Sequence, residues 1–111
     1  MSGDAGQVLL VMCSLPDEPS ARQLARHLVE SGLAACVNVL APCASTYRWQ
    51  GATEEATEVP VMIKTSSRRY SELEAAILTC HPYELPEIVA VPVTHGLPAY
   101  LEWVTGETRT A

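Results

Sequence analysis

The order in which strand-like and helix-like segments follow one another constrains the fold of this chain more than any other feature. Residues 8–13 form a short continuous apolar run, which is typical of a strand covered on both faces. Residues 21–29 then place apolar side chains at helical spacing, after a capping segment that begins at Asp17 and before a glycine at position 32. The first part of the chain therefore predicts a strand followed by a helix.

Two long strand patterns come next and predict a hairpin. The first runs over residues 33–50 and is expected to break at Pro42, and the second covers residues 54–65. Residues 51–52 are the expected turn between the two strands. Pro60 has no N–H to donate to a neighbouring strand, so we expect it to mark a sheet edge or a bulge.

A second helix and a further strand complete the pattern. A helix capped by a serine is predicted between residues 66 and 82, a strand over residues 88–93, and a short helix over residues 98–106. The resulting order, β-α-β-β-α-β with a C-terminal helix, predicts a ferredoxin-like split βαβ arrangement. In that α+β fold an antiparallel sheet carries both main helices on one face, and a long β-hairpin extends from it.

Length and charge limit the classes of protein to which this chain can belong. Its 111 residues suit one domain, and a formal net charge of −6 argues against binding of nucleic acid. The polar N-terminus and the short apolar runs favour a cytoplasmic protein without membrane insertion. The four cysteines have no paired spacing and are expected to be free thiols. Residues 1–7 and 106–111 are the expected flexible ends of the domain.

The predicted hairpin carries more apolar side chains than two helices can cover. These residues are Tyr47, Trp49, Val59, Val61 and Ile63. An exposed sheet face and a long hairpin edge favour pairing with other copies of the chain. We therefore expect a closed oligomer, most simply a small cyclic ring.

Six short sequence blocks occur in order along the chain. They are CSLPDE (13–18), LAACVN (33–38), YRWQG (47–51), IKT (63–65), HPYELPEI (81–88) and YLEW (100–103). Together these blocks resemble the CutA divalent-ion tolerance family, over about residues 8–104. The resemblance implies a ferredoxin-like homotrimer with a role in tolerance of copper and other divalent cations. It attaches no catalysed reaction to the family, and we expect that the chain is not an enzyme.

The resemblance also implies a set of metal ligands. Copper ligation in the family is assigned to a cysteine after the first strand and to a His-His pair, which correspond here to Cys13 and to Cys80 and His81. Cys80 replaces the first histidine of the pair, and a thiol favours Cu(I) or zinc over Cu(II). We expect the end of the first strand and the end of the second helix to lie at opposite poles, roughly 20 Å apart. Ligation would then need neighbouring protomers or separate, loose sites.

Each of the three residues also has an interpretation as a structural residue that binds no metal. Cys13 would end a buried strand, and Cys80 would close the apolar stripe of the second helix. His81 would donate a hydrogen bond to a carbonyl at the end of that helix.

A second group of candidate site residues combines aromatic, basic and acidic side chains. Its members are Tyr47, Trp49, Lys64, Tyr83, Glu84 and Glu87. On the predicted fold the hairpin aromatics and the loop after the second helix meet at a protomer boundary. There they form either a cleft for a small ligand or a packed interface.

Three functions agree with these features. The first is a homotrimer that binds or responds to copper or another divalent cation. The second is a small-molecule signalling trimer, because the architecture resembles that of PII signal-transduction proteins. The third is a non-catalytic assembly or anchoring scaffold. Fold analogy alone does not decide among them.

Overall fold

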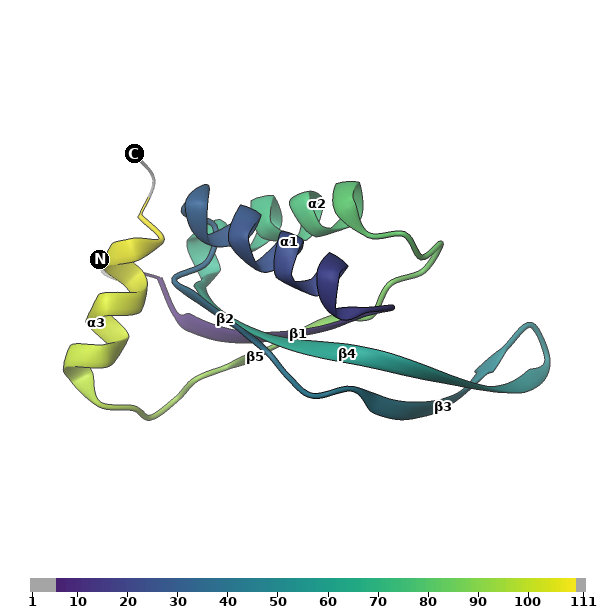
Figure 1. Cartoon of the computed structure of the whole chain (residues 1–111). Helices are drawn as coiled ribbons and strands as arrows, with labels where there is room; N and C mark the ends of the chain where they lie inside the picture. Colours follow the sequence, from purple (N-terminus) through teal and green to yellow (C-terminus); the bar gives the residue numbers. More distant parts are fainter. Residues whose placement is uncertain (1–5, 110–111) are drawn as a thin grey trace.

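The computed structural model describes residues 6–109, in which α1 and α2 pack on one face of an antiparallel sheet (Figure 1). The elements follow in the order β1 (Val8–Leu15), α1 (Glu18–Glu30), β2 (Cys36–Val39), β3 (Cys43–Trp49), β4 (Ala52–Ser66), the 3₁₀ helix η1 (Ser67–Arg69), α2 (Tyr70–Cys80), β5 (Ile88–Pro92) and α3 (Pro98–Glu107). The strand order is β2-β4-β1-β5, and β3 pairs with the far part of β4. This is the predicted ferredoxin-like α+β fold, in which β2 and β3 together replace one long strand.

The ends of α1 follow from the residues that flank it. Asp17 is the N-cap, and its side-chain oxygen accepts a hydrogen bond from the Ser20 N–H at 2.9 Å. Beyond the last turn Gly32 adopts a φ of +75°, a left-handed conformation that glycine takes without steric cost. Both signals are local, and both predicted helix ends are confirmed.

The core lies between the sheet and the two helices. Its fully buried side chains include Val11, Cys13, Val61, Ile63, Leu28, Leu73 and Ile77. Val59 is also only 3% exposed. The expectation that the valines and isoleucine of the hairpin lie on an uncovered face was therefore wrong, because the alternation of β4 turns them toward the helices.

The other face of the sheet carries the exposed apolar side chains instead. Met12 of β1 pairs with Met62 of β4 and with Val89 of β5, and Leu10 pairs with Val91. Met12, Val89 and Val91 are 39%, 51% and 50% exposed. Neither α1 nor α2 lies on this face, and α3 covers only its end, where Val8 and Val93 pack against Val104 (Figure 1).

The hairpin of β3 and β4 extends well beyond the helices (Figure 1). Its turn is formed by Gln50 and Gly51, with φ values of +51° and +83°, one residue earlier than predicted. Pro60 lies in β4, a central strand and not a sheet edge, but the expected bulge is present beside it: between the pairs Val39–Val61 and Cys43–Glu58, residues 40–42 oppose residues 59–60. The Pro60 carbonyl accepts from the N–H of Leu40, so its own nitrogen faces the break around Pro42, where a donor is not required.

The C-terminal helix α3 lies at the end of the molecule opposite the hairpin (Figure 1). It continues through Gly106, the predicted end, because Thr108 closes it: the buried Thr108 hydroxyl donates to the Val104 carbonyl at 2.8 Å. Of the termini predicted to be flexible, residues 1–5 and 110–111 lie outside the described residues. No helix within residues 6–109 is both long enough and apolar enough to span a bilayer.

Candidate functional site

His81 connects the end of β1 to the loop that follows α2. Its Nε2–H donates to the Ser14 carbonyl oxygen, with 2.6 Å between the heavy atoms, and its Nδ1 accepts from the Tyr83 N–H at 3.1 Å. The imidazole ring of His81 and the phenol ring of Tyr83 are also in contact, with their centroids 4.7 Å apart. Both ring nitrogens are therefore engaged by the protein. The ring does donate to a carbonyl, but to one on a strand and not to one at the end of a helix.

The end of β1 and the end of α2 therefore lie at the same pole. The expected separation of roughly 20 Å is wrong, since the residue after Cys13 is in hydrogen-bond contact with His81. The reason is the direction of the chain. β4 is antiparallel to β1, and α2 runs back along β4, so β1 and α2 run the same way and end together.

Cys13 and Cys80 have opposite surroundings, although all four cysteines are free thiols as expected. Cys13 is 1% exposed, its Sγ donates to the Ser14 carbonyl at 3.9 Å, and burial raises the pKa of its thiol to about 11. Because its side chain is buried, a metal ion in solvent does not reach the Cys13 Sγ in this conformation. Cys80 is exposed at the end of α2 and does not complete an apolar stripe.

One protomer does not assemble the predicted ligands into a metal centre. Within residues 6–109 no group of three or more His, Cys, Asp or Glu side chains is arranged to hold a metal ion. Cys13 is buried as a thiol, and each ring nitrogen of His81 already has a partner. Cys80 alone of the three is open to solvent. In this protomer the residues do not fit a centre made of Cys13, Cys80 and His81.

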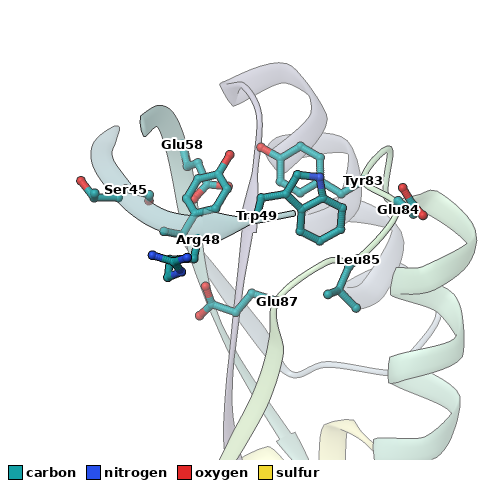
Figure 2. A pocket seen from close by; sticks show the side chains of 10 residues that line it. Ser45, Arg48, Trp49, Glu58, Tyr83, Glu84, Leu85 and Glu87 are labelled. Carbon is teal, nitrogen blue, oxygen red and sulfur yellow. The ribbon is translucent and has the colours of Figure 1, made fainter. Parts of the chain in front are cut away.

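A cavity of about 640 Å³ lies between β3 and the loop that joins α2 to β5 (Figure 2). The structure places five of the six predicted cleft residues around it: Tyr47, Trp49, Tyr83, Glu84 and Glu87. The aromatic side chains of β3 thus meet the loop that His81 holds against β1. Residues from two distant parts of the chain build this one cavity.

Lys64, the sixth predicted cleft residue, lies elsewhere. Its ammonium group donates a hydrogen bond to the side-chain oxygen of Asn38 in β2, in a groove beside α1. Lys64 and Glu58 of the cavity are both in β4 but six positions apart, about 20 Å along an extended strand. The cavity therefore has no lysine from this strand.

Glu58, Arg48 and Leu85 line the cavity but were not among the predicted cleft residues. The register puts Glu58 opposite Cys43, and hence on the same face of the hairpin as Tyr47. The same register puts Glu54 opposite Tyr47, so cross-strand pairing alone indicates both glutamates, and of these two Glu58 lines the cavity.

The cavity is acidic and contains a phenol that stays neutral. Glu58, Glu84 and Glu87 contribute carboxylates, against the single guanidinium of Arg48. Burial, together with the Glu58 carboxylate that accepts a hydrogen bond from the phenol, raises the pKa of Tyr83 to about 12. The Tyr83 hydroxyl is therefore a hydrogen-bond donor throughout the physiological pH range.

Comparisons with known proteins agree with this fold. Residues 9–107 match the family described as CutA1 divalent ion tolerance protein. The CutA homolog of Xenopus laevis is 43% identical over 100 residues, which is 90% of this chain and 66% of that protein, just under two thirds of its length. The crystal structure of CutA from Xylella fastidiosa has a TM-score of 0.90 at 42% identity, covering 94% of this chain and 100% of the other.

A more distant solved relative shows the same fold. The periplasmic divalent cation tolerance protein CutA of Archaeoglobus fulgidus has a TM-score of 0.88 at 32% identity, covering 92% of this chain and 99% of the other. The family match extends over nearly all of the described residues. The chain therefore belongs to the CutA1 divalent ion tolerance family.

Proposed function

We propose that this chain acts in tolerance of divalent cations, copper among them, as a cytoplasmic homotrimer. Its membership of the CutA1 divalent ion tolerance family carries the role. The name of the family attaches no reaction to the chain, and the proposed action is binding of, or response to, the cation.

The exposed part of the sheet face opposite α1 and α2 supports the oligomer. Met12, Val89 and Val91 expose apolar surface there, and β2 and β5 leave both edges of the sheet open to a further strand. A cyclic ring covers such a face with the same patch of surface in every copy, and it closes without leaving a free edge. A homotrimer is the form that the family resemblance implies.

The proposed cation site lies between protomers and includes Cys80. Cys80 is the predicted ligand that reaches solvent, whereas Cys13 and His81 are buried and engaged within one chain. A thiol ligand suits Cu(I) or zinc better than Cu(II). Further ligands would come from a neighbouring copy, because one protomer supplies no cluster of three within residues 6–109.

Native mass spectrometry of the reduced, metal-free protein tests the oligomer and the cation together. Titration with Cu(I), Cu(II) and Zn²⁺ should give a trimer with a fixed number of bound ions. Cys80→Ser should remove this binding, while Cys43→Ser, at another exposed thiol on β3, should leave it intact. A monomeric mass would contradict the trimer. Variable ion uptake that Cys80→Ser does not change would contradict the site.

The role itself can be tested in cells. Expression of this chain in a copper-sensitive host should permit growth at higher copper concentrations, and the Cys80→Ser variant should not. Equal growth with an empty vector would contradict the proposed role. Fractionation of the same cells tests the proposed location, because recovery of the protein outside the cytoplasm would contradict it.

The cavity favours a second candidate function, a trimer that binds a small molecule as a signal. A volume of about 640 Å³ with aromatic walls and several charged groups is typical of a small-ligand site. A thermal-shift panel of small metabolites tests this function directly. We expect at least one metabolite to raise the melting temperature without added metal. If no metabolite in the panel does so, the small-molecule function is contradicted.

A further inference from the structure

One wall of the cavity beside β3 is aromatic and apolar. Figure 2 shows Trp49, Tyr83 and Leu85 facing the cavity, with Trp49 coming from the hairpin and the other two from the loop after α2. The faces of indole and phenol rings carry partial negative charge and attract cations. This wall therefore favours a positively charged group that also has apolar surface.

The other groups around the cavity reinforce this preference. Three carboxylates face one guanidinium, so the cavity carries an excess of negative charge. This excess of charge sets up a field that attracts cations. Low-dielectric walls concentrate such a field inside a cavity. An anionic ligand would meet repulsion there.

The spacing of the carboxylates excludes a small inorganic ion as the best ligand. Within residues 6–109 no three acidic, histidine or cysteine side chains converge closely enough to coordinate a metal. The carboxylates are instead distributed around a space of about 640 Å³, which suits a molecule with several heavy atoms. A ligand of that size can place ammonium groups near separate carboxylates.

The loop side of the cavity is fixed in advance of binding. His81 accepts a hydrogen bond from the Tyr83 backbone N–H and donates one to the Ser14 carbonyl, so the loop is held at Tyr83 against the end of β1. A wall that is already ordered costs less entropy when a ligand binds.

We propose that this cavity binds a small organic cation that carries alkylammonium groups. This inference deepens the second proposed function and rests on it. The ammonium groups lie near Glu58 and Glu87, and the carbon chain lies against Trp49 and Leu85.

Three probes of equal length test the charge preference. They are 1,4-diaminobutane, 1,4-butanediol and succinate, which share a four-carbon chain and are positive, neutral and negative. The chain has two tryptophans, and Trp103→Phe leaves Trp49 as the only indole that reports by fluorescence. Trp103 is in α3, at the end of the molecule away from the hairpin (Figure 1). The diamine should change Trp49 emission saturably and bind roughly tenfold or more tightly than the diol or succinate.

Charge-neutralising variants then locate the site. In the Trp103→Phe background, Glu87→Gln and Glu58→Gln should each weaken diamine binding about tenfold. Glu55→Gln is the matched control, because Glu55 is an exposed carboxylate of the same hairpin strand that does not line the cavity. An equal loss in this control would show attraction by overall charge and would overturn the site.

The remaining outcomes separate the ligand class from the function. Binding of succinate or the diol as tight as that of the diamine would overturn the cationic class while the small-molecule function stands. If none of the probes changes Trp49 emission and the metabolite panel is also silent, both are overturned. Shielding of Trp49 from acrylamide in that silent protein would show that a second copy fills the cavity, which overturns the proposal.

Discussion

Replacing His81 by alanine should destabilise the fold even in the absence of any metal. The ring is 8% exposed and makes hydrogen bonds of 2.6 Å to the Ser14 carbonyl and 3.1 Å to the Tyr83 N–H. A buried hydrogen bond contributes about 1 kcal/mol net, and a buried partner left unpaired costs about 1–3 kcal/mol. We therefore expect His81→Ala to lower the free energy of unfolding by about 2–4 kcal/mol.

Urea unfolding in the presence of a chelator measures this loss. Wild type and variant are compared at one protein concentration, because the stability of an oligomer depends on concentration. His81→Phe keeps an aromatic ring beside Tyr83 but makes neither hydrogen bond, so it should lose most of the same free energy. His27→Ala is the matched control at an exposed position of α1, and it should change stability by less than about 0.5 kcal/mol.

The metal-ligand interpretation of His81 makes the opposite prediction for this experiment. A residue that serves only as a ligand has no partner to lose in metal-free protein, so His81→Ala would then unfold at the wild-type urea concentration. That result, combined with a loss of stabilisation by added copper, would refute the structural role derived from the contacts to Ser14 and Tyr83.

Other predictions follow from local geometry. The buried Cys13 thiol, whose pKa burial raises to about 11, should react with a thiol reagent far more slowly than exposed Cys43, and equal rates by mass spectrometry would contradict its burial. Gly51→Ala should cost about 1–2 kcal/mol because φ is +83°, whereas Gly106→Ala inside α3 should add about 0.5–1 kcal/mol in urea unfolding. Hydrogen bonds from Ser20, in the first turn of α1, lower the pKa of Asp17 below its ordinary value. The stabilisation that the ionised Asp17 gives to the fold is therefore present above that value and is lost as pH falls through its folded-state pKa. In Asp17→Asn the urea midpoint should depend less on pH in this range than it does in the wild type.

The elements that local chemistry determines could be predicted from the sequence. Asp17 and Gly32 supply the two ends of α1 through contacts within a few residues, and these contacts form as expected. For Pro60 the sequence left an edge and a bulge open, and the structure has the bulge, because the neighbouring strand breaks near Pro42. A single sequence shows that a proline has no donor, but it does not show which strand faces its nitrogen.

The candidate site was predicted in its residue chemistry but not in its connections. Trp49 and Tyr83 meet as expected because the fold brings the hairpin to the loop after α2. The contact of His81 with Ser14 was not predicted, because it depends on the antiparallel pairing of β4 with β1, which makes β1 and α2 run in the same direction. Lys64 was included among the predicted cleft residues because a lysine suits a ligand site. The length of β4 places it too far from the cavity.

The two proposed sites lie on either side of one loop, and this arrangement makes their independence measurable. Cys80 ends α2 and Glu87 lies just before β5, while the bonds of His81 hold the segment between them against β1. If cation binding through Cys80 and ammonium binding beside Glu87 are separate, Cys80→Ser should leave diamine affinity unchanged, and Glu87→Gln should leave the ion count unchanged. The double variant should then show only the sum of the two effects, as for sites without shared partners. A loss of diamine binding in Cys80→Ser would instead show that the loop couples the sites, because the contacts made by His81 are the direct connection between them.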